Sequence, residues 1–252
     1  MIDTHSHIDL PVFADDFDYV LQRAREAGVT AQILPGVVRS GWQRILQLSA
    51  EEQDLYAAIG LHPMYLSQHG QGDLESLRQL ALDGRLVAIG EIGLDYYVKN
   101  SDRSDQQKLF EAQLAIAGEA GLPVLLHVRK AHDQVQATIR RLGFTGGGIV
   151  HAFSGSLQQA EQYIKLGFLI SVCGTITYTR ATRIRMVAKT LPLTALVVET
   201  DSPDIPPSTH HGEQNYPEYL PEILSTIADL RMEPYEQVAR QLEENSRLLL
   251  DL

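Results

Sequence analysis

Two histidines stand two positions apart at the start of the chain, in the segment Met1-Ile-Asp-Thr-His-Ser-His7. If this segment begins as a strand, His5 and His7 point to the same side, because alternate side chains of a strand share a face. Two neutral imidazoles side by side can chelate a divalent ion. A polar strand face is the other interpretation of such a pair, and the remaining histidines and carboxylates of the chain must decide between the two.

Further histidines and carboxylates follow short apolar segments along the chain. These residues are His62, Glu91, His127, His151 and Asp201. Of the nine histidines, those that lie away from such segments are His69, His132, His210 and His211. Histidines and carboxylates with only a structural role would be scattered among helices and loops. Their shared placement after apolar segments therefore favours a common metal site.

The elements that must position these residues are visible in the hydrophobic pattern. Apolar, β-branched segments occupy residues 2–5, 31–36, 55–60, 86–91, 122–127, 148–151, 168–172 and 195–199. They barely alternate in polarity, which is typical of parallel strands covered on both faces. Amphipathic segments of helical period lie between them, among others residues 15–27, 104–120, 156–166 and 179–191.

A strand and a helix repeated about eight times predict a single (β/α)8 TIM barrel over residues 1–252. An open, doubly wound sheet is the main alternative. No Gly-x-Gly-x-x-Gly follows the first strand and no Walker loop is present, which weakens that alternative. Reactive groups of such barrels gather at the carboxyl ends of the strands, where the seven candidates above are expected to meet.

The types of ligand limit which metal ions the site can bind. Imidazole and carboxylate without thiolate suit Zn, Mn, Ni, Co or Fe, and two such ions need a bridging group. Glu91 is the natural bridge. A carbamylated lysine could bridge instead, but the five lysines fall in predicted loops or helices: Lys99, Lys108, Lys130, Lys165 and Lys189.

Six sequence blocks resemble the TatD family of metal-dependent deoxyribonucleases and hydrolases. They are Asp3-Thr-His-Ser-His7, Gly60-Leu-His-Pro63, Gly90-Glu-Ile-Gly-Leu-Asp95, Leu126-His-Val-Arg129, His151-Ala-Phe-Ser-Gly155 and Glu199-Thr-Asp-Ser-Pro203. Within the family the chain resembles the YjjV-like bacterial branch, through residues 153–161 and 174–178. The resemblance implies a TIM barrel of the amidohydrolase superfamily, two metal ions and nuclease activity on DNA.

The resemblance also implies how the ligands are shared. The first metal is expected at His5, His7, Glu91 and Asp201, and the second at Glu91, His127 and His151. Many family members carry Arg-Asn-x-Pro near the end of the chain, whereas this chain has Gln214-Asn-Tyr-Pro217. Any substrate contact made by that arginine is therefore absent or replaced.

Two divalent ions (Zn, Mn, Ni, Co or Mg) would lower the pKa of a water and stabilise phosphoryl oxygens. Asp201 and Glu91 are the expected catalytic residues, with Asp201 either a ligand and general base or a ligand alone. The expected substrate contacts are His62, Arg129, Tyr178 and Arg180, with Lys130 and Arg183 nearby. A core contact for His62 and solvated loop positions for the others are the alternatives. Glu199 and Asp95 could orient ligand histidines or be buried structural carboxylates.

The composition of the chain limits which partners the protein can bind. A formal net charge of −11 argues against a broad nucleic-acid surface, so DNA or another phosphoester is expected to bind locally at the metals. Such a pocket favours a 3′–5′ exonuclease on single-stranded or frayed DNA. The single cysteine, Cys173, and the lack of a membrane-spanning or signal segment predict a buried thiol in a cytoplasmic protein. Nothing in the sequence indicates a required protein partner.

Two other functions stay open. The same metal-activated water could attack a carbonyl carbon, in a lactone, a cyclic amide or an aminoacyl-tRNA ester. A barrel whose metals only stabilise the fold, or that serves as a partner scaffold, would need a closed coordination shell, whereas six ligands shared by two ions leave open positions.

Overall fold

Eight strands form the centre of the protein. A computed structural model describes residues 1–98 and 102–252, so the predicted loop position of Lys99 lies outside the described residues. The strands are β1 (Ile2–Asp3), β2 (Ala31–Pro35), β3 (Leu55–Ile59), β4 (Ala88–Asp95), β5 (Val124–Arg129), β6 (Gly148–Val150), β7 (Phe168–Val172) and β8 (Leu196–Val198). Each strand lies close to a predicted apolar segment, and for β7 the predicted bounds are those of the structure.

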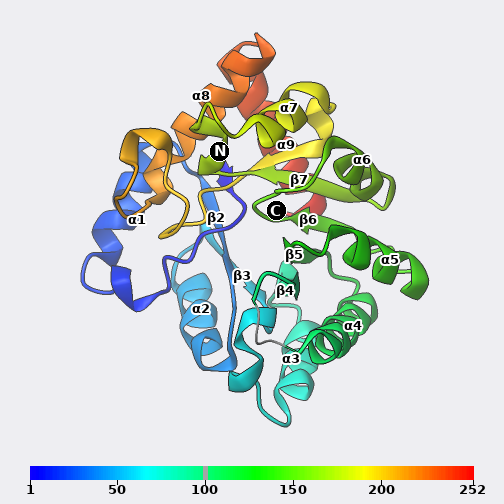
Figure 1. The fold of residues 1–252 in the computed structure, drawn as a ribbon. Coiled ribbons are helices and arrows are strands. Elements are labelled where there is room, and N and C mark those ends of the chain that lie inside the picture. The colour runs from blue at the N-terminus through cyan, green and yellow to red at the C-terminus, as the bar shows by residue number, and fades with distance from the viewer. Residues whose placement is uncertain (99–101) are drawn as a thin grey trace.

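The strands form one parallel sheet in chain order, β1 to β8. The sheet is closed where the chain leaves β8 beside β1. There Thr4 N–H donates to Val198 O over 3.2 Å, and Asp201 N–H donates to His5 O over 2.9 Å. Figure 1 looks into the resulting barrel, with the helices arranged around the strands. The predicted TIM barrel is confirmed.

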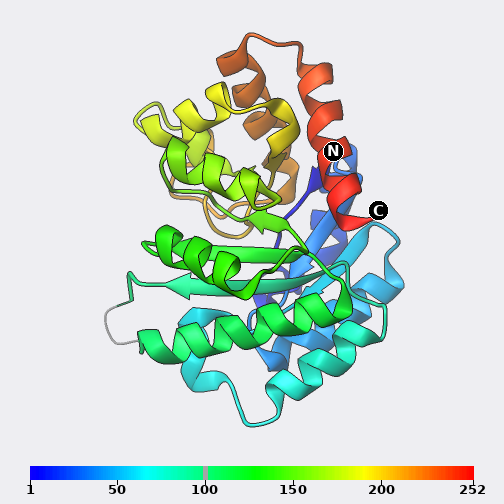
Figure 2. The same ribbon diagram turned by 90° about the vertical axis from the view of Figure 1, so that its right-hand side faces the viewer.

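The helices cover the outside of the barrel. They are α1 (Phe17–Glu26), α2 (Arg39–Glu51), α3 (Asp73–Leu82), α4 (Arg103–Ala120), α5 (His132–Leu142), α6 (Leu157–Lys165), α7 (Thr182–Thr190), α8 (Leu220–Arg231) and α9 (Tyr235–Leu250). Two helices, α8 and α9, follow the last strand, and α9 passes beside the N-terminus, where Met1 N lies 3.1 Å from Glu243 Oε2 (Figure 2). Among the described residues, no helix is long and apolar enough to cross a bilayer.

Apolar side chains fill the barrel axis at one end. One buried residue from each of six strands contributes to a small cluster: Ile33, Ala58, Ala88, Leu125, Ile149 and Val197. Side chains from six strands of a closed barrel can meet only by pointing inward. A larger apolar cluster packs the outside of the strands against the helices. Burial on both faces explains why the strand segments show little alternation.

Strands β4 and β5 both continue beyond the ends that the sequence predicts. The predicted segments end at Glu91 and His127, but β4 continues to Asp95 and β5 to Arg129, so both ligands lie within their strands. Gly93 makes this continuation possible. It has a φ of 142°, and a Cβ there would lie 2.0 Å from His127 O, so only glycine allows the two strands to approach. The expectation that Glu91 and His127 follow their strands is therefore wrong.

Candidate metal centre

Seven side chains, six of them buried and one, His127, partly buried, converge at the carboxyl ends of the strands. They are His5, His7, His62, Glu91, His127, His151 and Asp201, which come from the chain at or just after β1, β3, β4, β5, β6 and β8. Glu91 is 3% exposed and Asp201 is 8% exposed. Charged groups are this deeply buried when they are paired or when they bind a cation, so the position indicates a built site.

One group of possible ligands joins the first strand to the last. His5 Nε2 and His7 Nε2 lie 3.2 Å apart. Asp201 Oδ1 lies 3.8 Å from each of these nitrogens. The three side chains form one of the groups whose ligand atoms all lie within 4.8 Å of one another. β1 ends at Asp3, so the two histidines follow the strand and do not share one of its faces as predicted, but their rings meet at one site.

A second group lies on the neighbouring strands and consists of His62, Glu91 and His127. His127 Nδ1 lies 2.9 Å from Glu91 Oε1, and His62 Nε2 lies 3.2 Å from the same oxygen. His151 lies between the two groups, since its Nε2 is 3.6 Å from Asp201 Oδ1 and 3.9 Å from Glu91 Oε1.

The two carboxylate oxygens of Glu91 face different groups. Oε1 faces His127 and His62, whereas Oε2 lies 3.3 Å from His5 Nε2. A carboxylate placed in this way can give one oxygen to each of two cations. Imidazole nitrogens and carboxylate oxygens that converge on two neighbouring points are consistent with a binuclear metal site.

The electrostatics of the histidines suit metal binding. Burial lowers the pKa of His5, and the neighbouring His151 lowers it further. Burial and His5 together lower the pKa of His7 to about 3. Both rings are therefore neutral at pH 7, which is the form that offers a lone pair to a metal. Burial works against the charge of Glu91, but the histidines His62 and His5 outweigh it and hold its pKa well below the usual range.

Protons occupy part of the site when no cation is bound. Burial raises the pKa of Asp201 to about 8. For His151, burial alone would lower the pKa, but the carboxylates of Glu199 and Asp201 outweigh it and raise the pKa to about 10. A cation that binds these groups takes the place of the protons, because ligands bind metals in their deprotonated form.

Two outer carboxylates hold ligand histidines in place. Asp95 Oδ2 lies 2.9 Å from His127 Nε2, on the ring edge opposite Glu91. Glu199 Oε1 lies 2.9 Å from His151 Nδ1, a distance typical of an ion pair, although the angle is not that of a hydrogen bond. Asp95 and Glu199 are fully buried. Such partners fix which ring nitrogen carries the proton and which faces the metal.

A buried carboxylate that the sequence interpretation missed joins the two ends of the barrel. Asp3 accepts hydrogen bonds from His5 N–H over 3.2 Å and from Thr200 N–H over 2.9 Å. The Thr200 hydroxyl donates to its other oxygen over 2.5 Å. Asp3 therefore aligns the backbone of one metal-binding segment with the other. Its place at the end of β1, two residues before His5, was the available signal.

His62 is held as a hydrogen-bond donor toward Glu91. Met64 N–H donates to His62 Nδ1 over 3.1 Å, so this nitrogen is an acceptor and the proton lies on Nε2. Burial lowers the pKa of His62, which keeps the ring neutral. The Nε2–H group therefore points at Glu91 Oε1, 3.2 Å away. A core position without polar contacts, the alternative interpretation of this residue, does not describe it.

The other predicted substrate residues flank two separate hollows. Arg129 lines one of about 860 Å³, and its guanidinium carbon lies 3.8 Å from the centre of the Tyr97 ring. Tyr178 and Arg180 line another, of about 620 Å³. Lys130 directly follows β5, and its ammonium lies over the Tyr97 ring, 4.8 Å from the centre.

The segment of residues 203–211 packs against the barrel beside Asp201. Asn215 Nδ2 donates to Thr200 O over 2.8 Å and to Asp204 O over 2.6 Å, so it ties this segment to the strand end. His210 stacks on Tyr219 with ring centres 3.7 Å apart. His211 Nδ1 lies 3.2 Å from the Tyr178 hydroxyl. Both histidines have protein partners and lie outside the groups of possible ligands.

Replacing Asp95 with asparagine should weaken metal binding about 10- to 100-fold, the usual effect of removing such a partner. The new amide would place a donor opposite His127 Nε2, which itself carries the proton when Nδ1 faces a metal. Calorimetric titration of the metal-free variant with Mn or Zn measures this. Asp73→Asn, at a buried carboxylate that pairs with Arg39, is the matched control. Affinity equal to that of the unchanged protein would contradict the assignment.

The fold and the site together define a class. A (β/α)8 barrel with buried histidines around a shared carboxylate at the carboxyl ends of its strands is that of a metal-dependent hydrolase.

The family follows from comparison with known proteins. The profile of the family described as TatD related DNase matches residues 2–251, and the chain belongs to this family. It is 43% identical over 254 residues to the uncharacterized metal-dependent hydrolase YjjV of Escherichia coli K12, covering 100% of this chain and 98% of that protein. The crystal structure of YjjV superposes with a TM-score of 0.96, covering 100% of this chain and 98% of that chain. The 3′-5′ ssDNA/RNA exonuclease TatD of Pantoea ananatis is 32% identical over 259 residues, covering 100% of each chain.

Proposed function

We propose that the protein is a two-metal phosphodiesterase that removes nucleotides from the 3′ end of single-stranded or frayed DNA. The observation that carries this proposal is the position of Glu91. One of its oxygens lies 2.9 Å from His127 Nδ1 and the other lies 3.3 Å from His5 Nε2. The carboxylate is thus ready to join two cations, the arrangement used in in-line displacement at phosphorus.

The two groups of possible ligands indicate which residues would hold the two ions. His5, His7 and Asp201 would hold one ion, His127 and His151 would hold the other, and Glu91 would bridge them. When bound, such ions lower the pKa of a water and neutralise charge on the phosphodiester. Zn, Mn, Ni, Co and Mg are the candidates, because the ligands are nitrogen and oxygen atoms without sulfur.

Each of these side chains then has a separate role in the reaction. Asp201 accepts the proton of the attacking water, because its carboxylate lies beside both ligand groups. His62 keeps its proton on Nε2 and can donate it in a hydrogen bond to a phosphoryl oxygen. Asp95 and Glu199 hold the His127 and His151 rings in the orientation that this requires.

The shape and charge of the mouth favour a strand end over a long duplex. The chain as a whole has a net charge of −11, so the phosphate backbone has no broad cationic surface to follow. Arg129, Arg180 and Tyr178 lie in hollows at the mouth and would contact the strand away from the scissile bond. The relative named a 3′-5′ ssDNA/RNA exonuclease supports the same polarity. A cytoplasmic location agrees with the free, buried thiol of Cys173.

Metal-stripped protein resupplied in turn with Mg, Mn, Co, Ni and Zn tests the proposal. A single-stranded oligonucleotide labelled at its 5′ end should be shortened stepwise with at least one of these metals, and chelation should stop the reaction. An oligonucleotide blocked at its 3′ end should resist, whereas one blocked at its 5′ end should not. Intact DNA in the presence of two bound metals per chain would contradict the proposal and favour attack on a carbonyl substrate.

A further inference from the structure

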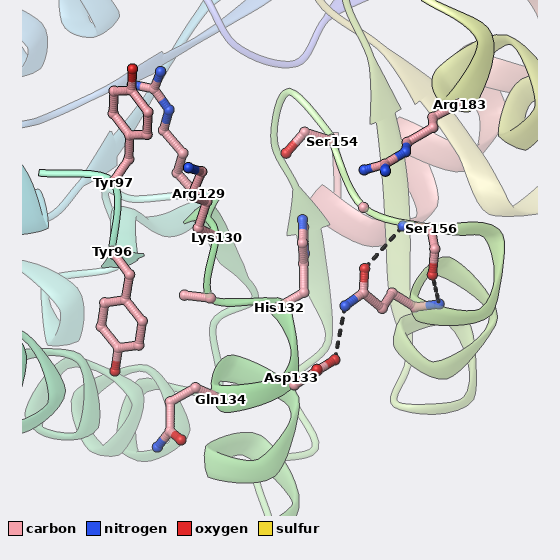
Figure 3. Close-up of a pocket in the computed structure, with 13 residues that line it drawn as sticks. Tyr96, Tyr97, Arg129, Lys130, His132, Asp133, Gln134, Ser154, Ser156 and Arg183 are labelled. Carbon is pink, nitrogen blue, oxygen red and sulfur yellow. Dashed lines mark hydrogen bonds between the residues drawn. The ribbon is translucent and has the colours of Figure 1, made fainter.

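A cationic hollow opens beside the candidate metal centre. It has a volume of about 860 Å³ and lies between the ends of β4 and β5, the start of α5 and the segment before α6 (Figure 3). Among residues 1–98 and 102–252, its charged lining consists of Arg129, Lys130 and Arg183 against the single carboxylate of Asp133. The hollow is therefore positive in a chain whose net charge is −11.

The three cations of this hollow have no ion pair with any residue in the ranges 1–98 and 102–252. Elsewhere on the surface, arginines such as Arg25 and Arg141 do pair with neighbouring carboxylates. Asp133 is engaged within the protein, because its Oδ1 accepts a hydrogen bond of 2.8 Å from Gln159 Nε2, drawn as a dashed line in Figure 3. The positive charge of the hollow is thus left for a ligand.

A buried histidine without a partner lies in the same hollow. His132 is 7% exposed, and both of its ring nitrogens are buried without a hydrogen bond to a described residue. Figure 3 shows its ring standing between the segment that carries Lys130 and the loop that carries Ser154. Burial lowers the pKa of His132 to about 4, so the ring is neutral at pH 7 and offers one donor and one acceptor. Buried polar groups are rarely left unpaired, which indicates a missing ligand.

The backbone contributes further donors. Helix α5 begins at His132, and no side chain of the described residues caps its N-terminus. Its first residues, His132 to Gln134, line the hollow. Free N–H groups at the start of a helix, with the positive end of its dipole, favour an anion such as a phosphate.

The hollow is joined to the metal centre through short stretches of chain. Arg129 lies two residues beyond the ligand His127, a separation of about 6.6 Å along a strand. On β4, Asp95 accepts a hydrogen bond from Tyr97 N–H over 2.9 Å on one oxygen and lies 2.9 Å from His127 Nε2 on the other. One carboxylate therefore positions both a metal ligand and the aromatic wall of the hollow.

We propose that this hollow is a second phosphate site, which binds the backbone of the nucleic-acid strand at a nucleotide away from the scissile bond. Arg129, Lys130 and Arg183 bind the phosphate, with His132 and the start of α5 as hydrogen-bond donors. The half-exposed ring of Tyr97 lies at the rim and holds the Arg129 guanidinium, whose carbon is 3.8 Å from the ring centre. The site rests on the proposed nuclease function and assigns it a polymeric substrate rather than a small phosphoester.

Binding of a single-stranded 12-mer, measured by fluorescence anisotropy on metal-loaded protein, tests this site. Phosphorothioate linkages in the 12-mer slow cleavage during the measurement. The variant Lys130→Ala/Arg183→Ala should raise the dissociation constant about tenfold and flatten the slope of log Kd against log salt by roughly 0.7, the contribution of one single-strand phosphate contact. Lys165→Ala removes a cation at the far end of α6 and should change neither quantity.

The outcomes separate this site from the proposed function. A dissociation constant and a salt slope equal to those of the unchanged protein would overturn the second phosphate site, as would a failure of the unchanged protein to bind the 12-mer. Tight binding that depends on Lys130 and Arg183 without cleavage of any oligonucleotide would keep the site and refute the nuclease. A His132→Phe variant adds a readout free of charge change, and we expect it to weaken binding about threefold with an unaltered salt slope.

Discussion

Glu91→Gln should lower phosphodiester hydrolysis by at least about four orders of magnitude, because it removes the group that joins the two metal sites. The glutamine side chain has nearly the same shape, but its single carbonyl oxygen cannot serve both the His127 side and the His5 side. In the structure those histidines face different oxygens of Glu91, at 2.9 Å and 3.3 Å. Hydrolysis of bis(p-nitrophenyl) phosphate, with metal content measured on the same samples, gives the result.

The same variant should keep its fold but lose its response to metal. The metal-free protein should melt within a few degrees of the unchanged protein, while the rise in Tm caused by added metal should largely disappear. Glu119→Gln is the matched control, because this carboxylate lies on α4 and pairs with Arg78 at the surface. Two bound metals per chain together with a tenth or more of the activity would refute the bridging role.

The barrel could be predicted from the sequence because each strand is a short apolar segment of chain. The bounds predicted for residues 168–172 are those of β7, because four of the five residues are apolar and only Leu169 is partly exposed. The segment predicted for β4 ends at Glu91, before the strand itself ends, for the opposite reason. Beyond Ile89, the alternate positions Glu91, Gly93 and Asp95 carry two carboxylates and a glycine in place of apolar side chains. A functional strand therefore looks like the start of a loop.

The ligand types and their placement could also be predicted, but not the outer partners of the histidines. Asp95 meets His127 because β4 and β5 pair Gly93 with His127 after a shift of register between Ile89 and Ile92. Such a shift is a property of the backbone and leaves no pattern in the sequence. The contact of Asp3 with Thr200 spans 197 positions and exists only because the barrel closes.

The role of His62 shows a further limit. Its residue type allows a metal ligand, a hydrogen-bond donor or a core contact, and spacing does not choose among them. The choice depends on which ring nitrogen carries the proton, and this is set by the Met64 amide, 3.1 Å from Nδ1. Local backbone geometry, rather than composition, therefore assigns the chemistry.

Asp201→Asn separates proton transfer from metal binding, and we expect kcat to fall about 10²- to 10⁴-fold. The backbone of Asp201 is firmly held, with a φ of 62° and an N–H group that donates to His5 O over 2.9 Å. An asparagine also tolerates this left-handed conformation and keeps an oxygen for ligation. It cannot accept a proton at neutral pH, so metal content should stay close to that of the unchanged protein while turnover is lost. Asp204→Asn, three residues further along and exposed, is the matched control.

The pH dependence of kcat, compared between the unchanged protein and Asp201→Asn, gives the sharper test. A general base works when deprotonated, so the kcat of the unchanged protein should rise with pH through the pKa of Asp201. Burial raises this pKa to about 8 in the metal-free site, and a bound cation favours the carboxylate, so the rise should lie below pH 8. Asp201→Asn should lose this rise along with the rate. If the variant keeps near-normal turnover with the same pH profile, Asp201 only ligates metal and another group accepts the proton.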